Sequence, residues 1–298
     1  MRFEGTYTAL VTPFSPSEGL PIDWEAFDAV VADQLAGGIT GLVPCGTTGE
    51  SPALTHEEHL AVVKRTVARA KGKAQIIAGT GSNSTRHAID LSREAEACGV
   101  DAVMVVVPYY NKPTQEGLYR HFVAVAHAVK CPVVIYNIPG RSAVDLSADT
   151  LSRIVKDASN VVATKEATGN VLRAQELVRR HGDALTVLSG DDALTLAMIA
   201  VGARGVISVT SNVVPGAVTK ATALALAGEA KAARAAHQAL LPLHEVMFVE
   251  SNPAPAKAAL AHRGILRDVV RGPLAEASES ARAAVLATLK AYEGRGAT

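Results

Sequence analysis

A lysine ends one apolar, β-branched run of the chain, and a Gly-Asn turn follows it. The run covers residues 161–164, the lysine is Lys165, and the turn is Gly169-Asn170. A lysine held against apolar side chains has a lowered pKa, and its neutral amine can attack a carbonyl carbon and form a Schiff base. The alternative is a side chain that runs along the strand end and puts its ammonium in solvent. Taken alone, the pattern is compatible with a nucleophile or with a surface cation.

Hydroxyl groups and glycines gather at the ends of other predicted strands. A Gly-Thr-Thr-Gly turn contains Thr47 and Thr48, and its backbone N–H groups could hold a carboxylate, although an ordinary glycine-rich turn has the same composition. Tyr109, Tyr110 and Tyr136 are half of the six tyrosines in the chain. A phenol can pass protons to and from a carbinolamine, particularly beside a threonine hydroxyl. The Tyr136 ring could also belong to the core.

An arginine and two small polar segments complete the candidate site. Arg141 follows Tyr136 in the same predicted loop, where a guanidinium could bind a carboxylate at two points; a solvent-exposed arginine is the alternative. Residues 189–192 and 207–212 suit the wall of a pocket, and they contain Gly190 and Ile207. No His, Cys, Asp or Glu cluster has metal-ligand spacing, and no Gly-x-Ser-x-Gly or phosphate-binding loop occurs. We therefore expect neither a metal nor a separate cofactor.

Composition excludes several classes of partner. The chain of 298 residues is 48% hydrophobic and 19% charged, and its 29 basic and 29 acidic residues give no net charge. This balance gives no electrostatic reason to expect nucleic acid or an anionic membrane, and no apolar run is long enough for a membrane helix. Cys45, Cys98 and Cys131 are odd in number and widely spaced, as expected for reduced thiols. Residues 1–5 lack the apolar core of a signal peptide, so a cytoplasmic location is expected.

Short apolar segments alternate with amphipathic helical patterns along most of the chain. Such strands are typical of a parallel sheet buried on both faces. Asp23 and the pair Thr55 and Glu58 are expected to cap two of the helices. Eight units would build a closed (β/α)₈ barrel, although periodicity alone also allows an open doubly wound sheet. The predicted strands cover residues 6–11, 39–43, 76–78, 102–107, 133–136, 161–164, 186–188 and 205–207.

The strand pattern stops after about residue 214, and alanine-rich helical segments follow. We expect helices over residues 228–249 and 275–292, and between them a helix with Asn252 as its N-cap and Pro253 at its first position. The sequence thus predicts a barrel over residues 1–226 and a helical domain over residues 227–298. The inner faces of these helices are apolar, so we expect them to pack on the barrel or on a partner subunit.

Four motifs, taken together and in this order, resemble the pyruvate-dependent class I aldolase superfamily, which includes the dihydrodipicolinate synthases and the N-acetylneuraminate lyases. The resemblance implies a (β/α)₈ TIM barrel with a C-terminal α-helical extension. It also implies a homotetramer, built as a dimer of dimers. The motifs are Gly-Thr-Thr-Gly-Glu-Ser at residues 46–51, Pro-Tyr-Tyr-Asn-Lys-Pro at 108–113, Tyr-Asn-Ile-Pro-Gly-Arg at 136–141 and Lys-Glu-Ala at 165–167.

The resemblance also implies roles for individual residues. Lys165 would form a Schiff base with pyruvate, and Tyr136 would donate and accept the protons. Thr47 would complete a proton relay together with Tyr110, which would cross into the neighbouring subunit's site. Thr48, Gly190 and Ile207 would line the pyruvate pocket. Arg141 would bind the carboxylate of L-aspartate 4-semialdehyde, which favours the synthase branch and the diaminopimelate and lysine pathway.

The sequence leaves open whether lysine inhibits the protein, and it leaves two alternative functions. Relatives inhibited by lysine bind it at the tight dimer interface, but His87 stands where they carry an acidic residue, so we expect weak lysine inhibition or none. One alternative function is an aldolase or lyase acting on a 2-keto-3-deoxy sugar acid or N-acetylneuraminate. The other is a non-catalytic binding barrel, which would not need Lys165, Tyr136 and Thr47. The positions that match the effector site are Ser51, Leu54, His56, His59, Asn83 and Tyr109.

Overall fold

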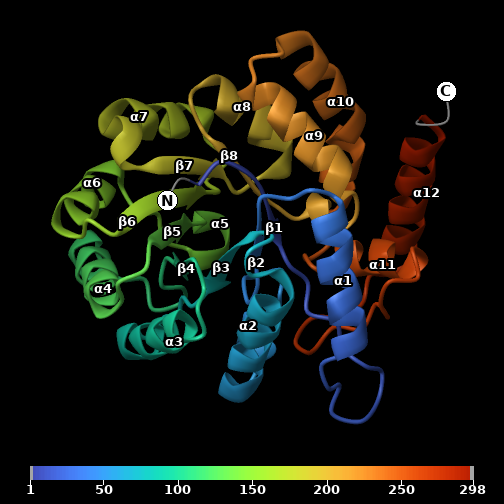
Figure 1. The fold of residues 1–298 in the computed structure, drawn as a ribbon, viewed down its shortest axis with the longest axis horizontal. Helices are drawn as coiled ribbons and strands as arrows, with labels where there is room; N and C mark the ends of the chain where they lie inside the picture. Colours follow the sequence, from blue (N-terminus) through green and yellow to red (C-terminus); the bar gives the residue numbers. More distant parts are fainter. Residues whose placement is uncertain (1–2, 296–298) are drawn as a thin grey trace.

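The eight predicted strands form one closed parallel barrel in the computed structural model, which describes residues 3–295 (Figure 1). Each strand pairs with its neighbours in chain order, and β8 closes the barrel against β1. The predicted TIM barrel is therefore confirmed, and the open sheet is wrong. The strands are β1 (Gly5–Ala9), β2 (Gly41–Val43), β3 (Gln75–Gly79), β4 (Ala102–Val106), β5 (Val133–Asn137), β6 (Val161–Glu166), β7 (Thr186–Ser189) and β8 (Gly205–Ser208).

Helices surround the barrel, and a side-chain cap marks the start of six of the nine helices from α1 to α9. The Asp23 carboxylate accepts a hydrogen bond from the Ala26 N–H, and Thr55 and Glu58 form the expected capping box. Figure 1 shows the ring of helices around the strands. The helices are α1 (Trp24–Ala36), α2 (His56–Ala70), α3 (Thr85–Ala97), α4 (Gln115–Ala128), α5 (Pro139–Ser142), α6 (Ala148–Asp157), α7 (Val171–His181), α8 (Thr195–Ala200) and α9 (Pro215–Leu226).

The strands bury side chains on both faces, which explains their continuous apolar sequence. Inside the barrel, Tyr7, Met104 and Ile207 belong to one buried cluster. Outside it, Phe27 and Phe122 belong to a larger cluster that fills the layer between strands and helices. Because side chains alternate between the two faces of a strand, the inner cluster also fixes which residues can reach the mouth of the barrel at the C-terminal ends of the strands.

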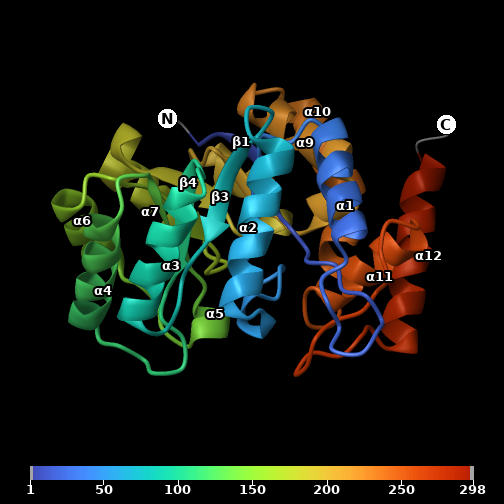
Figure 2. The ribbon, with the colours of Figure 1, turned by 60° about the horizontal axis from the view of Figure 1, so that its bottom comes forward.

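Three helices follow the barrel: α10 (Ala230–Val246), α11 (Ala254–His262) and α12 (Glu279–Arg295). Figures 1 and 2 show α11 and α12 beyond α1, at one side of the barrel. The predicted boundary falls at the end of α9, but Leu240, Leu243 and Leu260 belong to the same buried cluster as the barrel's outer layer. A separate helical domain over residues 227–298 stays a prediction, and residues 1–2 and 296–298 of the predicted domains lie outside the described residues.

One expected cap is wrong. The N-cap of α11 is Pro253, and the Asn252 side chain does not bind the helix start. Its Nδ2 donates instead to Thr48 Oγ1 at 2.9 Å. The amide is therefore used for a contact between distant segments, which a local capping rule cannot predict.

No helix within residues 3–295 combines the length and the apolar character that crossing a membrane requires.

Candidate active site

Lys165 lies inside the barrel, near the C-terminal end of β6. Its side chain is 5% exposed, and its Nζ lies 4.2 Å from the centre of the Tyr136 ring. The contact follows from strand register, because Tyr136 on β5 pairs with Lys165 on β6. The ammonium does not extend into solvent, so the surface-cation alternative is wrong.

Burial changes the acid–base properties of this amine. It lowers the pKa of Lys165 to about 8; Asp192 partly opposes the shift and Arg141 adds to it. A lysine with a pKa near 8 is about one-tenth neutral at pH 7, whereas an ordinary lysine is less than about one part in a thousand neutral. A much larger fraction of Lys165 than of an ordinary lysine is therefore neutral, which is the form that a nucleophilic amine needs.

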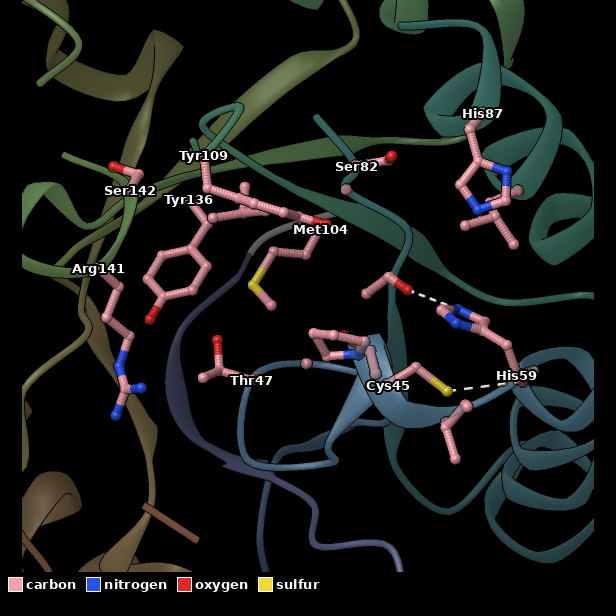
Figure 3. Close-up of a pocket in the computed structure, with 18 of the residues that line it drawn as sticks. Cys45, Thr47, His59, Ser82, His87, Met104, Tyr109, Tyr136, Arg141 and Ser142 are labelled. Atoms are coloured by element: carbon pink, nitrogen blue, oxygen red, sulfur yellow. Dashed lines mark hydrogen bonds between the residues drawn. The ribbon is translucent and has the colours of Figure 1, made fainter. Parts of the chain in front are cut away.

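Tyr136 shares the same apolar surroundings and has the opposite shift. Burial raises the pKa of its phenol to about 12, while Arg141 and a hydrogen bond with Thr47 act in the other direction. Figure 3 shows the phenol oxygen between Thr47 and Arg141. The phenol is protonated at neutral pH, so it can donate a proton to a leaving hydroxyl and pass it on through Thr47.

A cavity of about 420 Å³ opens beside these groups. Thr47, Tyr136 and Arg141 line one end of it, and His59 and His87 line the other (Figure 3). Lys165 is not among its lining residues, but its Nζ lies 4.2 Å from the centre of the Tyr136 ring, which does line the cavity. The structure therefore brings Thr47, Tyr136, Arg141 and Lys165 together, as the sequence predicted.

Two of the three predicted pyruvate-pocket residues, Gly190 and Ile207, lie beside Lys165 or in one cluster with Tyr136, whereas Thr48 does not line the cavity. A Cβ placed on Gly190 would be 3.2 Å from Lys165 Cε and 2.6 Å from the Ala167 Cβ, so the lysine packs directly over this glycine. Ile207 belongs to the inner barrel cluster with Tyr136. Thr48 is buried, and its hydroxyl accepts the hydrogen bond from Asn252.

Tyr110 is the predicted residue that the structure does not bring to Lys165. Its side chain is 87% exposed, and its backbone has a φ of 73°, in the left-handed region. Its neighbour Tyr109 lines the cavity instead. Within one chain, the predicted relay therefore ends at Thr47.

The candidate effector residues form the far part of the same cavity. Ser51, Leu54, His56, His59 and Tyr109 line it, whereas Asn83 does not. The His59 ring is hydrogen bonded to the Gly79 carbonyl at 2.8 Å, and burial lowers its pKa to about 4. His56 pairs with the Glu94 carboxylate at 2.7 Å, and its ring centre is 6.0 Å from that of His87.

The sequence did not predict two buried polar clusters. One joins Lys257 to Glu50, the fifth residue of the motif that begins at Gly46. The other surrounds Asp192, which ends the Ser-Gly-Asp-Asp segment that indicated only a polar wall. The local sequence does not show that these polar side chains are buried, so it could not predict the two clusters. Within residues 3–295, no group of three His, Cys, Asp or Glu residues is placed to hold a metal ion.

Comparisons with known proteins agree with this geometry. A model of the dihydrodipicolinate synthetase family matches residues 2–292. The 4-hydroxy-tetrahydrodipicolinate synthase of Sorangium cellulosum (strain So ce56) is 58% identical over 295 residues, which cover 99% of this chain and 98% of that protein.

Two solved structures are also similar along the whole chain. The synthase of the same name from Methylacidiphilum fumariolicum SolV is 44% identical, with a TM-score of 0.97 over 99% of this chain and 98% of that one. A chloride-inhibited dihydrodipicolinate synthase from Acinetobacter baumannii, solved in complex with pyruvate, is 41% identical, with a TM-score of 0.94 over 97% and 99% of the two chains. The chain belongs to the dihydrodipicolinate synthetase family.

Proposed function

We propose that this protein is a 4-hydroxy-tetrahydrodipicolinate synthase, which condenses pyruvate with L-aspartate 4-semialdehyde on the pathway to diaminopimelate and lysine. The observation that carries the proposal is the buried, partly neutral Lys165 against the Tyr136 ring. The pyruvate complex of the Acinetobacter baumannii relative and the name of the Sorangium cellulosum relative support it.

The first step joins pyruvate to Lys165. The neutral amine attacks the ketone carbon and forms a carbinolamine, and the loss of one water leaves a cationic imine. Loss of a proton from the methyl carbon converts the imine into an enamine, which is a carbon nucleophile. Lys165 itself therefore supplies the covalent chemistry, without a separate cofactor.

The second step forms the carbon–carbon bond and the ring. The enamine carbon attacks the aldehyde carbon of L-aspartate 4-semialdehyde, and the aldehyde oxygen takes up a proton and becomes the hydroxyl group. The amino group of the added substrate then attacks the imine carbon, closes the ring and releases the Lys165 amine. Tyr136 supplies and removes protons during these changes, because its phenol is protonated and hydrogen bonded to Thr47.

Arg141 is proposed to bind the carboxylate of the second substrate. Its guanidinium lies beside the Tyr136 hydroxyl at the mouth of the cavity (Figure 3). A planar guanidinium can bind a carboxylate at two points. Arg141→Ala should raise the KM for the semialdehyde by roughly 10- to 100-fold, the loss expected for one charge-assisted pair, while saturating pyruvate should still be trapped on Lys165. A steady-state assay of the variant with pyruvate and the semialdehyde tests this role of Arg141, and an unchanged KM would contradict it. The same assay of the unmodified protein with sugar-acid substrates tests the alternative lyase function.

Reduction with borohydride in the presence of pyruvate tests the covalent step. We expect the label on Lys165 after peptide mapping. Lys257 is a matched internal control, because burial lowers its pKa to about 8 as well, but its Nζ is held by Glu50 at 2.5 Å. Label on Lys257, or none on Lys165, would contradict the mechanism.

We also propose a homotetrameric, cytoplasmic enzyme with weak lysine inhibition or none. An effector lysine would need a carboxylate for its α-amino group. Position 87 is a histidine, and the carboxylate of Glu94 is already paired with His56. His87→Glu should therefore strengthen inhibition, measured as a lysine titration of the initial rate. A submillimolar inhibition constant for the unmodified protein would contradict the proposal.

A further inference from the structure

Residues 138–147 form the loop that carries Arg141 (the Arg141 loop), and this loop has little stability of its own. Arg141 lies in α5, a single helical turn that has no side-chain cap at its start. One turn is too short to form a stable helix by itself. Ala143 follows the turn with a φ of 58°, in the left-handed region that a residue other than glycine adopts only at a cost. Contacts from outside the turn must therefore hold Arg141 in place.

The exit of the Arg141 loop is tied to the end of β5 by a buried asparagine. Asn137, the last residue of β5, is 1% exposed, and its Oδ1 accepts a hydrogen bond from the Leu146 N–H at 3.2 Å. Within the loop, Ser142 Oγ lies 3.0 Å from the Ile138 carbonyl oxygen and 2.8 Å from the Val144 carbonyl oxygen. The two ends of the loop are thus linked across α5, so a movement of the loop exit also displaces this turn.

Arg173 on α7 bridges the loop exit and the strand that carries Lys165. Its Nη2 donates to the Leu146 carbonyl, and its Nε donates to Glu166 Oε2 at 3.0 Å. Glu166 is the residue after Lys165. The pair is buried, since the Glu166 side chain is 1% exposed and that of Arg173 is 11% exposed. One guanidinium therefore connects the Arg141 loop with the strand end that bears the nucleophile.

We propose that Arg173 is a positioning residue that holds the Arg141 loop at the spacing from Lys165 that the second substrate requires. The inference rests on the proposed function, because Arg141 has to bind the semialdehyde carboxylate. The enamine on Lys165 attacks the aldehyde carbon while Arg141 binds the carboxylate of the same molecule, so the two side chains must keep one spacing. If the loop occupies this position only part of the time, the apparent affinity for the semialdehyde falls by that fraction.

Arg173→Lys is the variant that tests the bridge. Lysine keeps the positive charge opposite Glu166, but its single nitrogen lacks the fixed fork with which arginine reaches the carboxylate and the Leu146 carbonyl together. At saturating pyruvate, the KM for the semialdehyde should rise by about tenfold, the change that corresponds to the loss of one hydrogen bond from a charged donor. The KM for pyruvate should stay within about twofold, since pyruvate reacts with Lys165 and does not need the loop.

Arg263→Lys is a matched control, because Arg263 also joins a carboxylate to a backbone carbonyl. It binds the Asp33 carboxylate at 3.0 and 3.1 Å and the Val213 carbonyl at 2.7 Å. It lies at the end of α11, beside α1 (Figure 1). Because the same kind of bridge is weakened away from the Arg141 loop, both KM values should stay within about twofold of those of the unmodified protein.

A double variant keeps the test decisive if Arg173→Lys does not fold. Glu166→Gln together with Arg173→Met removes both charges of the pair, so no buried charge is left without a partner. Gln can still accept the hydrogen bond that Glu166 Oε1 accepts from the Thr168 N–H at 3.0 Å. The double variant also lacks the donor to the Leu146 carbonyl, so the same selective rise in the KM for the semialdehyde is expected.

Combination with Arg141→Ala distinguishes positioning from a general loss of structure. If Arg173 acts through Arg141, Arg173→Lys should raise the KM for the semialdehyde by less than about twofold in the Arg141→Ala background, against about tenfold in the unmodified one. Equal effects in the two backgrounds would overturn the inference. An unchanged KM for the semialdehyde in the folded variant, equal rises for the two substrates, or the same rise in Arg263→Lys would overturn it as well.

The unmodified protein separates failure of this inference from failure of the proposed function. If it condenses pyruvate with the semialdehyde and traps pyruvate on Lys165, but Arg173→Lys or the double variant shows no selective change, only the role of Arg173 is overturned. If the unmodified protein neither condenses the two substrates nor traps pyruvate on Lys165, the proposed function is overturned, and the inference with it.

Discussion

Lys165 and Lys257 show why a lowered pKa alone does not identify a nucleophile. Burial lowers the pKa of both amines to about 8. Lys257 donates to Glu50 and to the Val269 carbonyl, so its nitrogen is held by two acceptors. Lys165 faces an aromatic ring, and its nitrogen donates to no acceptor within residues 3–295. The lack of acceptors that hold the charged form, together with the cavity lined by the same ring, distinguishes the lysine that can react.

The pH dependence of the reaction should follow the Lys165 amine. Below a pH of about 8 the reactive neutral form falls about tenfold per pH unit. We therefore expect kcat/KM for pyruvate to rise with pH up to about 8 and then to level off. A profile of initial rates from pH 6 to 9.5 measures it, and a flat profile across this range would contradict the assignment.

The same burial should make Lys165 costly for stability. Its folded pKa of about 8 lies below the unfolded value of about 10.4, so the penalty is fully present below pH 8 and disappears as the pH rises to the unfolded pKa. Lys165→Met should therefore raise the free energy of unfolding at pH 7 by up to ~3 kcal/mol. Urea denaturation at pH 7 and pH 10 tests the sign, and a variant less stable than the unmodified protein at pH 7 would contradict it.

At the scale of elements, α11 holds the loop that carries Thr47. Lys257 on α11 and Glu50 in the loop form a fully buried ion pair at 2.5 Å, and Glu50 Oε2 also accepts from the Arg271 N–H at 2.9 Å. Asn252 binds Thr48 from the segment before α11. These contacts fix the backbone beside the proposed proton relay.

Breaking this pair should affect both stability and activity. Lys257→Met leaves the Glu50 carboxylate buried without its cation, which costs about 3–5 kcal/mol for comparable pairs. We expect a large loss of thermal stability and a lower kcat, because the loop carrying Thr47 is released. The double variant Glu50→Gln with Lys257→Met should recover much of the stability. A single variant as stable as the unmodified protein would show that the pair does not hold the loop.

Strand positions could be predicted because buried parallel strands have a continuous apolar sequence and because local caps such as Thr55 and Glu58 mark helix starts. The positions of Lys165, Tyr136 and Thr47 could be predicted for the same reason, since Tyr136 and Lys165 lie at the C-terminal ends of such strands and Thr47 lies in the loop after one. The partners of Asp192 and Asn252 could not. These contacts span 16 and 204 residues of sequence, and they exist only once the barrel has closed.

At the scale of the whole molecule, the exposed Tyr110 implies that one chain does not hold the complete proposed relay. Its ring is 87% exposed in the single chain. If it completes a neighbouring site, Tyr110→Ala and Lys165→Ala should each be nearly inactive, yet subunits of the two variants mixed and reassembled should regain part of the activity. Initial rates before and after reassembly measure this, and the absence of any recovery in confirmed mixed oligomers would contradict the shared site.

The contacts between Thr48 and Asn252 and between Glu50 and Lys257 join positions 204 and 207 residues apart. A gene shortened after residue 226 would still encode all eight strands. Its product would lack the donor for the Thr48 hydroxyl and the cation for the Glu50 carboxylate. Recombination between related genes should therefore preserve function only when both ends of the coding sequence come from the same parent, or from parents that share these four residues.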